Sequence, residues 1–164
     1  MKLKIILTFC GIVLMVFLGL FYFSLRNNTQ DISGKEPYRF ALHKTLLTKR
    51  KVILARNLSG LHTPREYLLT EDRRLSEGIR EIEVVPPGTE MIFDRAVMHT
   101  NKTNGLSRSL LIGRVWVRSL DKEVVFEYEW GTLSRTCTEP PRDRWVFPAG
   151  IWQDEPEAGE YFVK

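Results

Sequence analysis

The sequence predicts a mostly β protein, a small antiparallel barrel or sandwich with at most one short helix, preceded by a single N-terminal transmembrane helix. Three observations support this: an uncharged run over residues 5–25, a Pro-Pro-Gly-Thr turn at residues 86–89, and alternation of apolar and polar side chains between residues 111 and 130. Alternation with a period of two is typical of a half-buried strand, because successive side chains point to opposite faces of a sheet. Several short strands separated by turns are typical of a barrel or a sandwich.

The N-terminal segment has the features of a membrane anchor. Lys2 and Lys4 precede the uncharged run over residues 5–25, and Arg26 ends it. At about 1.5 Å per helical residue this run reaches about 31 Å, which is enough to cross the apolar core of a bilayer. Its end is bulky and aromatic where a signal peptide has small residues before its cleavage site, and Cys10 lies too early in the run for lipid attachment. We therefore expect an uncleaved anchor.

The charges around this segment predict its orientation. The two lysines favour a cytoplasmic N-terminus. Residues 26–37 are polar and turn-rich, which predicts a linker, and residues 38–164 have the usual size of one domain. We expect a single-pass protein of the cell membrane with this domain outside, either periplasmic or extracellular. The net charge of +4 includes the anchor lysines, so a nucleic-acid partner is not expected.

Within the domain, residues 46–55 are rich in leucine and β-branched residues, which predicts a strand with a basic interruption. Residues 63–78 fit either a helix that starts at the capping box Thr63–Glu66 or a short strand, and the strand is slightly favoured. Turn-forming residues predict a loop over 100–105. Further strands are expected at residues 81–85, 91–98, 144–147 and 161–163.

The clearest pattern is a hairpin. Apolar and polar side chains alternate over residues 111–118 and again over 124–130, and Ser-Leu-Asp-Lys separates the two runs, which predicts antiparallel pairing. On its exposed face we expect ion pairs between two arginines and two glutamates, namely Arg114, Arg118, Glu127 and Glu129. The turn at residues 86–89 that leads into a strand is similar to one in SH3-like barrels, and this resemblance implies an SH3-like barrel as one form of the fold.

One segment resembles an enzyme active site. Thr-Leu-Ser-Arg-Thr-Cys at residues 132–137, followed by two arginines, resembles the active-site strand of sortases, which are membrane-anchored β-barrel transpeptidases. The sortase motif has one residue between Thr-Leu and Thr-Cys, whereas this chain has two. The resemblance implies a nucleophilic thiolate, a cation beside it and a histidine that protonates the leaving amine, at Cys137, Arg142 or Arg144, and His99 or His62.

Other signatures of catalysis are missing from the sequence. The three histidines have no metal-ligand spacing, and there is no phosphate-binding glycine loop, Gly-x-Ser-x-Gly elbow or His-Glu-x-x-His sequence. We therefore assign no catalytic residue with these patterns and expect no metal and no cofactor. Cys137 is the only cysteine after the anchor, so an internal disulfide in the domain is excluded.

The sequence instead favours a binding role. Tryptophan is enriched at binding hot spots, which makes Trp116, Trp130 and Trp152 candidate binding residues. We expect a membrane-anchored, non-catalytic domain that acts as an accessory, a sensor or an immunity-type inhibitor of a protein partner in the cell envelope. Two alternatives stay open: a sortase-like transpeptidase or hydrolase that uses Cys137, and a barrel that binds a cell-wall fragment or a lipid.

Overall fold

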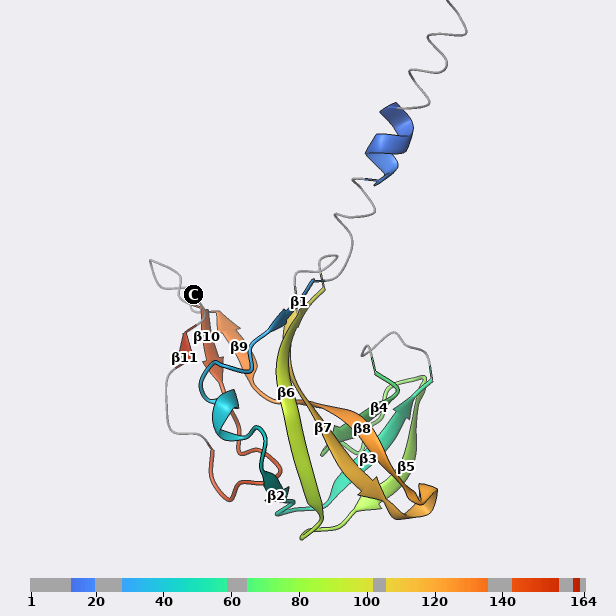
Figure 1. Cartoon of the computed structure of the whole chain (residues 1–164), viewed down its shortest axis with the longest axis vertical. Helices are drawn as coiled ribbons and strands as arrows, with labels where there is room; N and C mark the ends of the chain where they lie inside the picture. Colours follow the sequence, from blue (N-terminus) through green and yellow to red (C-terminus); the bar gives the residue numbers. More distant parts are fainter. Residues whose placement is uncertain are drawn as a thin grey trace, which may run out of the picture.

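The computed structural model describes residues 13–19, 28–58, 65–101, 106–135, 143–156 and 161–162. Within these residues the strands form a curved eight-stranded sheet and a separate three-stranded sheet (Figure 1). The order of the larger sheet is β1-β6-β7-β8-β4-β3-β5, with β2 also paired to β6, and that of the smaller sheet is β11-β10-β9. The elements are β1 (Asn28–Asp31), η1 (Tyr38–Phe40), β2 (Thr45–Leu47), β3 (Val52–Asn57), β4 (Tyr67–Thr70), β5 (Ile79–Val85), β6 (Glu90–Thr100), β7 (Ser107–Val117), η2 (Arg118–Leu120), β8 (Lys122–Glu129), β9 (Thr132–Arg135), β10 (Asp143–Val146) and β11 (Tyr161–Phe162).

The predicted hairpin is confirmed as β7 and β8. The two strands pair antiparallel from Val117 opposite Lys122 to Leu110 opposite Glu129. The 3-10 turn η2 joins them, and Asp121 ends that turn in the left-handed conformation, with φ of 48°. Aspartate is one of the few residues other than glycine that adopt this conformation readily. Antiparallel pairing of β6 with β7 extends the hairpin into the meander at the centre of the sheet.

The predicted ion pairs across this hairpin are wrong. The register places Val125 opposite Arg114 and Ile112 opposite Glu127, so the charges do not face each other as expected. The observed ion pairs are Arg114 with Asp94 and Glu123, Glu127 with Arg65, and Glu129 with Arg108. Two of these partners, Asp94 and Arg65, come from outside the hairpin.

The sheet also differs from the predicted antiparallel barrel. β4 runs parallel to β8, with Tyr67 opposite Phe126 and Leu69 opposite Tyr128, so the sheet is mixed. Its two end strands, β1 and β5, do not pair with each other among the described residues, so it is not a closed barrel of the SH3-like or any other kind. β4 lies beside β8 because Tyr67 and Leu69 both pack against the main core. Of the two structures considered for residues 63–78, the strand is therefore correct over Tyr67–Thr70.

The segment predicted to be a linker supplies part of the sheet. Within residues 26–37, β1 pairs antiparallel with β6, from Asn28 opposite Thr100 to Asp31 opposite Val97. The next residue, Ile32, is 1% exposed and belongs to the core. A polar segment without periodicity can serve here, because an edge strand has to satisfy the main-chain hydrogen bonds of only one neighbour.

The predicted anchor is described only in part. Residues 13–19 are helical, and residues 1–12 and 20–25 lie outside the described residues. Among the residues that the structure does describe, no helix has both the length and the apolar character needed to cross a bilayer.

Aromatic side chains fill the inner face of the curved sheet. Trp152 lies in the middle of this cluster, with its ring centroid 5.0 Å from that of Phe93, 4.9 Å from that of Trp130 and 6.1 Å from that of Tyr128. Edge-on contacts of this kind favour the positive ring edge over the negative ring face. The cluster gives β6 and β8 a rigid support on their inner side.

The loop that carries Trp152 is held by Arg50. The guanidinium group donates hydrogen bonds to the carbonyls of Ala149 and Gly150, each at 2.8 Å, and forms an ion pair with Glu71 at 3.4 Å. Arginine suits this position because its planar fork can reach several acceptors at once. These contacts between Arg50 and residues about one hundred positions later hold the loop of Trp152 against the aromatic cluster.

Candidate functional site

The outer face of the large sheet, which points away from the aromatic cluster, carries a second group of buried apolar side chains. They are Val97 on β6 and Leu110 and Ile112 on β7, which are 3%, 3% and 5% exposed. These residues alternate along their strands with the residues that pack on the inner face. Buried apolar side chains on both faces make the middle of the sheet a rigid floor.

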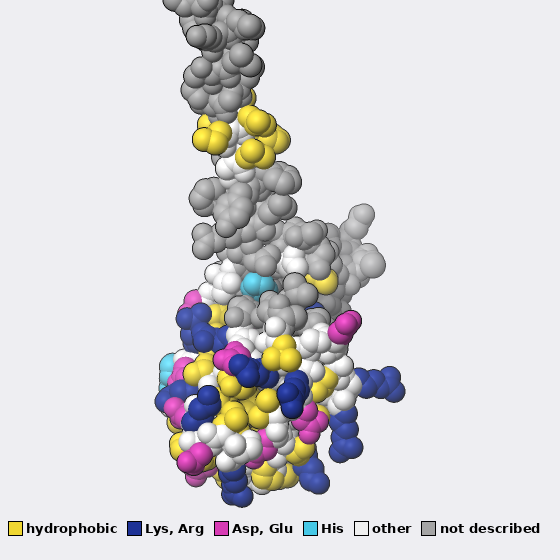
Figure 2. All heavy atoms as spheres, turned by 90° about the vertical axis from the view of Figure 1, so that its right-hand side faces the viewer, with side chains coloured by type: hydrophobic (Ala, Val, Ile, Leu, Met, Phe, Trp, Pro, Cys, Tyr) yellow, Lys and Arg dark blue, Asp and Glu magenta, His cyan; other side chains and the backbone are white. Residues whose placement is uncertain are grey.

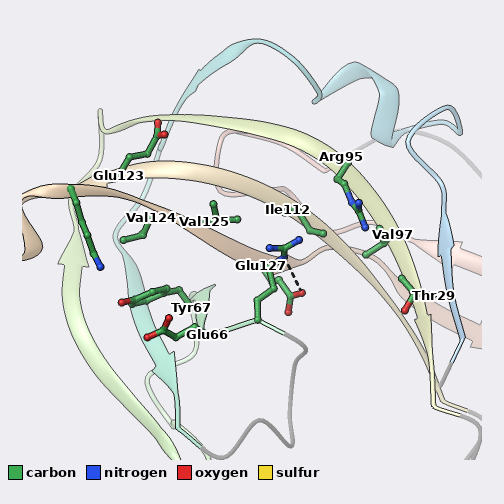
Figure 3. A pocket seen from close by; sticks show the side chains of 12 residues that line it. Thr29, Glu66, Tyr67, Arg95, Val97, Ile112, Glu123, Val124, Val125 and Glu127 are labelled. Atoms are coloured by element: carbon green, nitrogen blue, oxygen red, sulfur yellow. Dashed lines mark ion pairs between the residues drawn. The ribbon is translucent and has the colours of Figure 1, made fainter. Parts of the chain in front are cut away.

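A groove of about 620 Å³ crosses this floor and continues along the first half of β8. In Figure 3, Arg95, Val97 and Thr29 lie toward one end of the groove and Glu123 lies toward the other, with Glu127 between them. Sites for bound ligands commonly have volumes of about 300–1,000 Å³, apolar walls and a few well-placed polar groups. This groove has a volume in that range and an apolar floor, and charged side chains line much of its wall, which makes it the candidate functional site.

Glu127 is the buried charge at the centre of the groove. Its side chain is 2% exposed, and its Oε1 lies 3.9 Å from Nε of Arg65, the ion pair that is drawn dashed in Figure 3. Glu127 also lines an adjoining groove of about 410 Å³ beside β4. Burying a carboxylate is costly unless other groups compensate its charge, and the ion pair with Arg65 contributes to this compensation.

The carboxylates of the groove have basic partners. Glu66 pairs with Arg56 at 2.6 Å, Glu123 pairs with Arg114 at 3.5 Å, and Glu127 pairs with Arg65. The two remaining cations of the groove are different. Among the described residues, neither Arg95 nor Lys122 has a carboxylate within 4.0 Å.

The surroundings of these two cations are open. The Lys122 ammonium lies over the ring of Tyr67, 5.9 Å from its centroid. Arg95 is exposed and acts on Asp31 only at a distance: the hydrogen bonds from Ser33 are the main cause that lowers the pKa of Asp31, and the charge of Arg95 adds a smaller effect. The groove therefore presents two cations that are able to bind an anion.

The shape of the groove at β8 is that of a strand edge. A depression on one face of a sheet is lined by every second residue of a strand, whereas this groove is lined by the consecutive residues Lys122, Glu123, Val124 and Val125. β4 pairs with β8 only at Phe126, Glu127 and Tyr128, which leaves the earlier residues beside the groove.

The tip of the hairpin at this end is tied to β5. The main-chain N–H of Ser119 donates a hydrogen bond of 2.8 Å to Oε2 of Glu83. The side-chain and main-chain hydrogen bonds of Ser119 lower the pKa of Glu83, and the charge of Arg118 adds to this effect. The contact holds η2 and the start of β8 in a defined position.

The three tryptophans predicted to bind a partner differ in their exposure to solvent. Trp116 is 57% exposed on the outer face of β7. Trp130 is 1% exposed and donates its indole N–H to the carbonyl of Pro148, while Trp152 packs into the aromatic cluster. Of the three, Trp116 is therefore exposed, Trp152 is half-buried and Trp130 is buried. On the side of the molecule that Figure 2 shows, apolar side chains lie between separate basic and acidic ones.

The residues of the sortase resemblance are only partly described. Cys137, Arg142 and His62 lie outside the described residues. His99 lies on β6, where its Nδ1 is 3.3 Å from the hydroxyl of Thr29, and Arg144 lies on β10 of the smaller sheet, opposite Ser134. In the part of the chain that the structure describes, no three His, Cys, Asp or Glu side chains form a group suited to a metal ion.

The groove residues were not among the sequence candidates. Glu127 was expected to form a surface ion pair, and Arg65 and Arg95 carried no recognisable pattern. The one available signal was a glutamate within the alternating run of the hairpin. Comparison with known proteins finds no matching family model, no matching curated protein and no matching solved structure.

Proposed function

We propose that this chain is a membrane-anchored, non-catalytic binding domain that acts as an accessory, a sensor or an immunity-type inhibitor of a protein in the cell envelope. Residues 5–25 supply the anchor, which keeps the N-terminus in the cytoplasm and the domain outside. The groove along β8 is the docking surface. The observation that carries the proposal is this groove itself, with an apolar floor, a buried ion pair at its centre and two cations that lack a near carboxylate.

The packing of the interior supports a surface site over a ligand held inside the sheet. Phe93 and Phe126 are 0% exposed and Trp130 is 1% exposed, so aromatic rings occupy the space where a lipid or a cell-wall fragment would sit in a hollow barrel. Rigid strands with support on both faces also suit recognition, because little order has to be created on binding.

Site-specific photo-cross-linking in intact cells tests this function. A photoreactive phenylalanine analogue replaces Val125 in the groove, and the matched control carries it at Leu47 on β2; the two side chains are 41% and 50% exposed. We expect a defined envelope protein to be captured from position 125 and not from position 47. Capture should persist with Cys137→Ser and should fail when residues 5–25 are deleted.

The opposite results would reject the proposal. Capture from position 47 alone would move the docking surface away from the groove. Capture that requires Cys137 would favour the thiol chemistry implied by the sortase resemblance. Unchanged capture without residues 5–25 would remove the anchor from the function.

A further inference from the structure

We propose that the end of the sheet where β6 meets β7 rests on the outer leaflet of the membrane, with the side chain of Leu106 in the lipid head-group region. This inference rests on the proposed function, because it requires residues 5–25 to lie in the bilayer, and it adds a second contact with lipid. Three features of the structure lead to it: the short chain between the anchor and β1, the direction of the strands, and the fixed position of Leu106.

The first feature is the short chain between the proposed anchor and the sheet. The anchor ends at residue 25 and β1 starts at Asn28, so two residues lie between them. Three consecutive residues span at most about 11 Å, which sets the greatest distance of Asn28 from the end of the anchor. The paired segment adds no length, because the N–H of Ile32 donates to the carbonyl of Ala96 at 2.9 Å. The Ser33 hydroxyl also accepts from the N–H of Ala96 at 2.9 Å and donates to its carbonyl at 3.3 Å.

The second feature is the direction of the strands. β1 pairs antiparallel with β6 so that Asn28 lies opposite Thr100, and in Figure 1 these two strand ends lie side by side at the top of the sheet. The main-chain pairing of β6 with β7 continues past Thr100, since the N–H of Asn101 donates to the carbonyl of Leu106 at 2.9 Å. Leu106 is therefore farther along the strand direction than Asn28 and two strand spacings to its side, or about 10 Å at about 4.8 Å per spacing. The start of β1 and the end of β6 thus share one end of the domain, which we name the anchor-side end.

The third feature is the apolar side chain at the anchor-side end. Leu106 is 58% exposed, although its main chain is bonded to Asn101 and the hydroxyls of Thr100 and Ser107 lie 3.0 Å apart. A single exposed leucine is common on protein surfaces, so exposure alone identifies no partner. Its place does: the head-group region extends about 5–8 Å from the apolar core of the bilayer, within the reach of the chain that holds β1. Apolar side chains at a membrane surface lie at the boundary between head groups and acyl chains.

A lipid contact at this end sets the height of the groove above the membrane. Glu127, at the centre of the groove, lies opposite Ile112, and Val125 lies opposite Arg114. Ile112 and Arg114 are five and seven residues from Ser107 along β7, or about 17 and 24 Å at about 3.4 Å per residue. A partner that docks in the groove has to present its contact surface within this distance of the bilayer. A second membrane protein with an external domain meets this requirement.

Fluorescence quenching by nitroxide-labelled lipids tests the inference. The full chain, with Cys10→Ser and Cys137→Ser, receives one new cysteine by Leu106→Cys, which is labelled with nitrobenzoxadiazole after reconstitution into phosphatidylcholine vesicles. We expect a nitroxide on the lipid head group to quench this probe severalfold more strongly than a nitroxide at the end of the acyl chain. Arg108→Cys, two residues further along β7 and exposed, gives a second probe near the same end and should show the same order of quenching.

The matched control is a leucine at the opposite end of β6. Leu47 is 50% exposed and lies opposite Glu90, ten residues from Thr100. This separation is about 30 Å, at about 3.4 Å per residue with one bulge. A probe at Leu47→Cys should therefore lose no emission to either nitroxide. Equal quenching at positions 47 and 106, or none at positions 106 and 108, would overturn the inference.

Lengthening the chain before β1 tests whether the short connection causes the contact. A flexible insert of about ten Gly and Ser residues ahead of Asn28 adds about 17 Å of root-mean-square length, so quenching at position 106 should fall severalfold. The same insert between Met1 and Lys2 is the control, because it leaves the distance from the anchor to β1 unchanged. Quenching that is unchanged by the insert ahead of Asn28 would overturn the role of β1.

An alkaline wash of the vesicles separates failure of the inference from failure of the proposed function. If the wash releases the chain, residues 5–25 are not an anchor, and both proposals fail. If the chain stays in the vesicles and the probe at position 106 is not quenched, the inference fails alone. Cross-linking from position 125 then still decides whether the groove is the docking surface.

Discussion

Arg114 of β7 binds Asp94 of β6 through two parallel hydrogen bonds, from Nε to Oδ2 at 2.9 Å and from Nη2 to Oδ1 at 3.1 Å. Asp94 is the extra residue of a bulge, because Phe93 lies opposite Gly113 and the next paired residue, Arg95, lies opposite Ile112. A bulge shifts the alternation of side chains by one residue. Arg95 therefore faces the groove, whereas unbroken alternation from the buried Phe93 would have placed it in the core. One ion pair thus stabilises the backbone shift that positions a groove cation.

Breaking this pair should destabilise the bulge. We expect Asp94→Ala to lower the free energy of unfolding by about 0.5–1 kcal/mol, as for a well-oriented but partly exposed ion pair. Urea unfolding of the full chain in micelles measures the change, and a double-mutant cycle with Arg114→Gln isolates the pair. A coupling energy of zero would show that the two side chains act independently. Deletion of Asp94 should be much more damaging, because it would turn Arg95 toward the core.

Gly113 should not tolerate a side chain. A Cβ atom there would lie 2.5 Å from the carbonyl oxygen of Ile92 and 2.9 Å from the ring of Phe93. We expect Gly113→Ala to lower the free energy of unfolding by about 1–3 kcal/mol, as for other overpacked sites. Gly34→Ala is the matched control, since a Cβ at that position has no atom within 4 Å. Equal midpoints of urea unfolding for the two variants would contradict the prediction.

The ion pair at the centre of the groove should respond differently to the loss of each partner. Arg65→Ala leaves the carboxylate of Glu127 buried, at a cost of about 2–3 kcal/mol, because its charge then lacks this partner. Glu127→Gln should cost less, because glutamine is uncharged and the Arg65 side chain, 41% exposed, reaches water. The double variant should recover most of the loss caused by Arg65→Ala. Denaturant unfolding distinguishes the three variants, and a larger loss for Glu127→Gln than for Arg65→Ala would refute this account.

The contact that holds the hairpin tip should depend on pH. The hydrogen bonds from Ser119 lower the pKa of Glu83 from its usual value of 4.5, so the ionised carboxylate stabilises the folded state. This contribution is complete above the unfolded-state pKa and is lost as the pH falls through the lowered folded-state pKa. The difference in unfolding free energy between the wild type and Glu83→Gln should therefore be constant at neutral pH and shrink below about pH 4.5. A difference that stays the same down to about pH 3 would show that the hydrogen bond is not responsible.

The hairpin shows what local patterns can predict. Alternation from Leu111 to Trp130 was sufficient to predict β7 and β8, because the two strands are neighbours in the sequence and each has one face in the core. The ion pairs across it were predicted wrongly. Charge pairing depends on the register, and the register follows from the geometry of η2, in which Val117 comes to lie opposite Lys122.

The sequence by itself determined the β character of the domain and the central hairpin, since each depends on side-chain alternation or on turn-forming residues within a few positions, whereas it left residues 63–78 open between a helix and the strand observed at Tyr67–Thr70. Only the tertiary structure decided that β4 runs parallel to β8, that Asn28–Asp31 joins the sheet, and that Arg65 meets Glu127. These contacts join residues far apart in the chain. Their free energy comes from burying shared surface and compensating a buried charge, which no short window of sequence contains. The groove exists because β4 covers only part of β8, and that is a property of the assembled sheet.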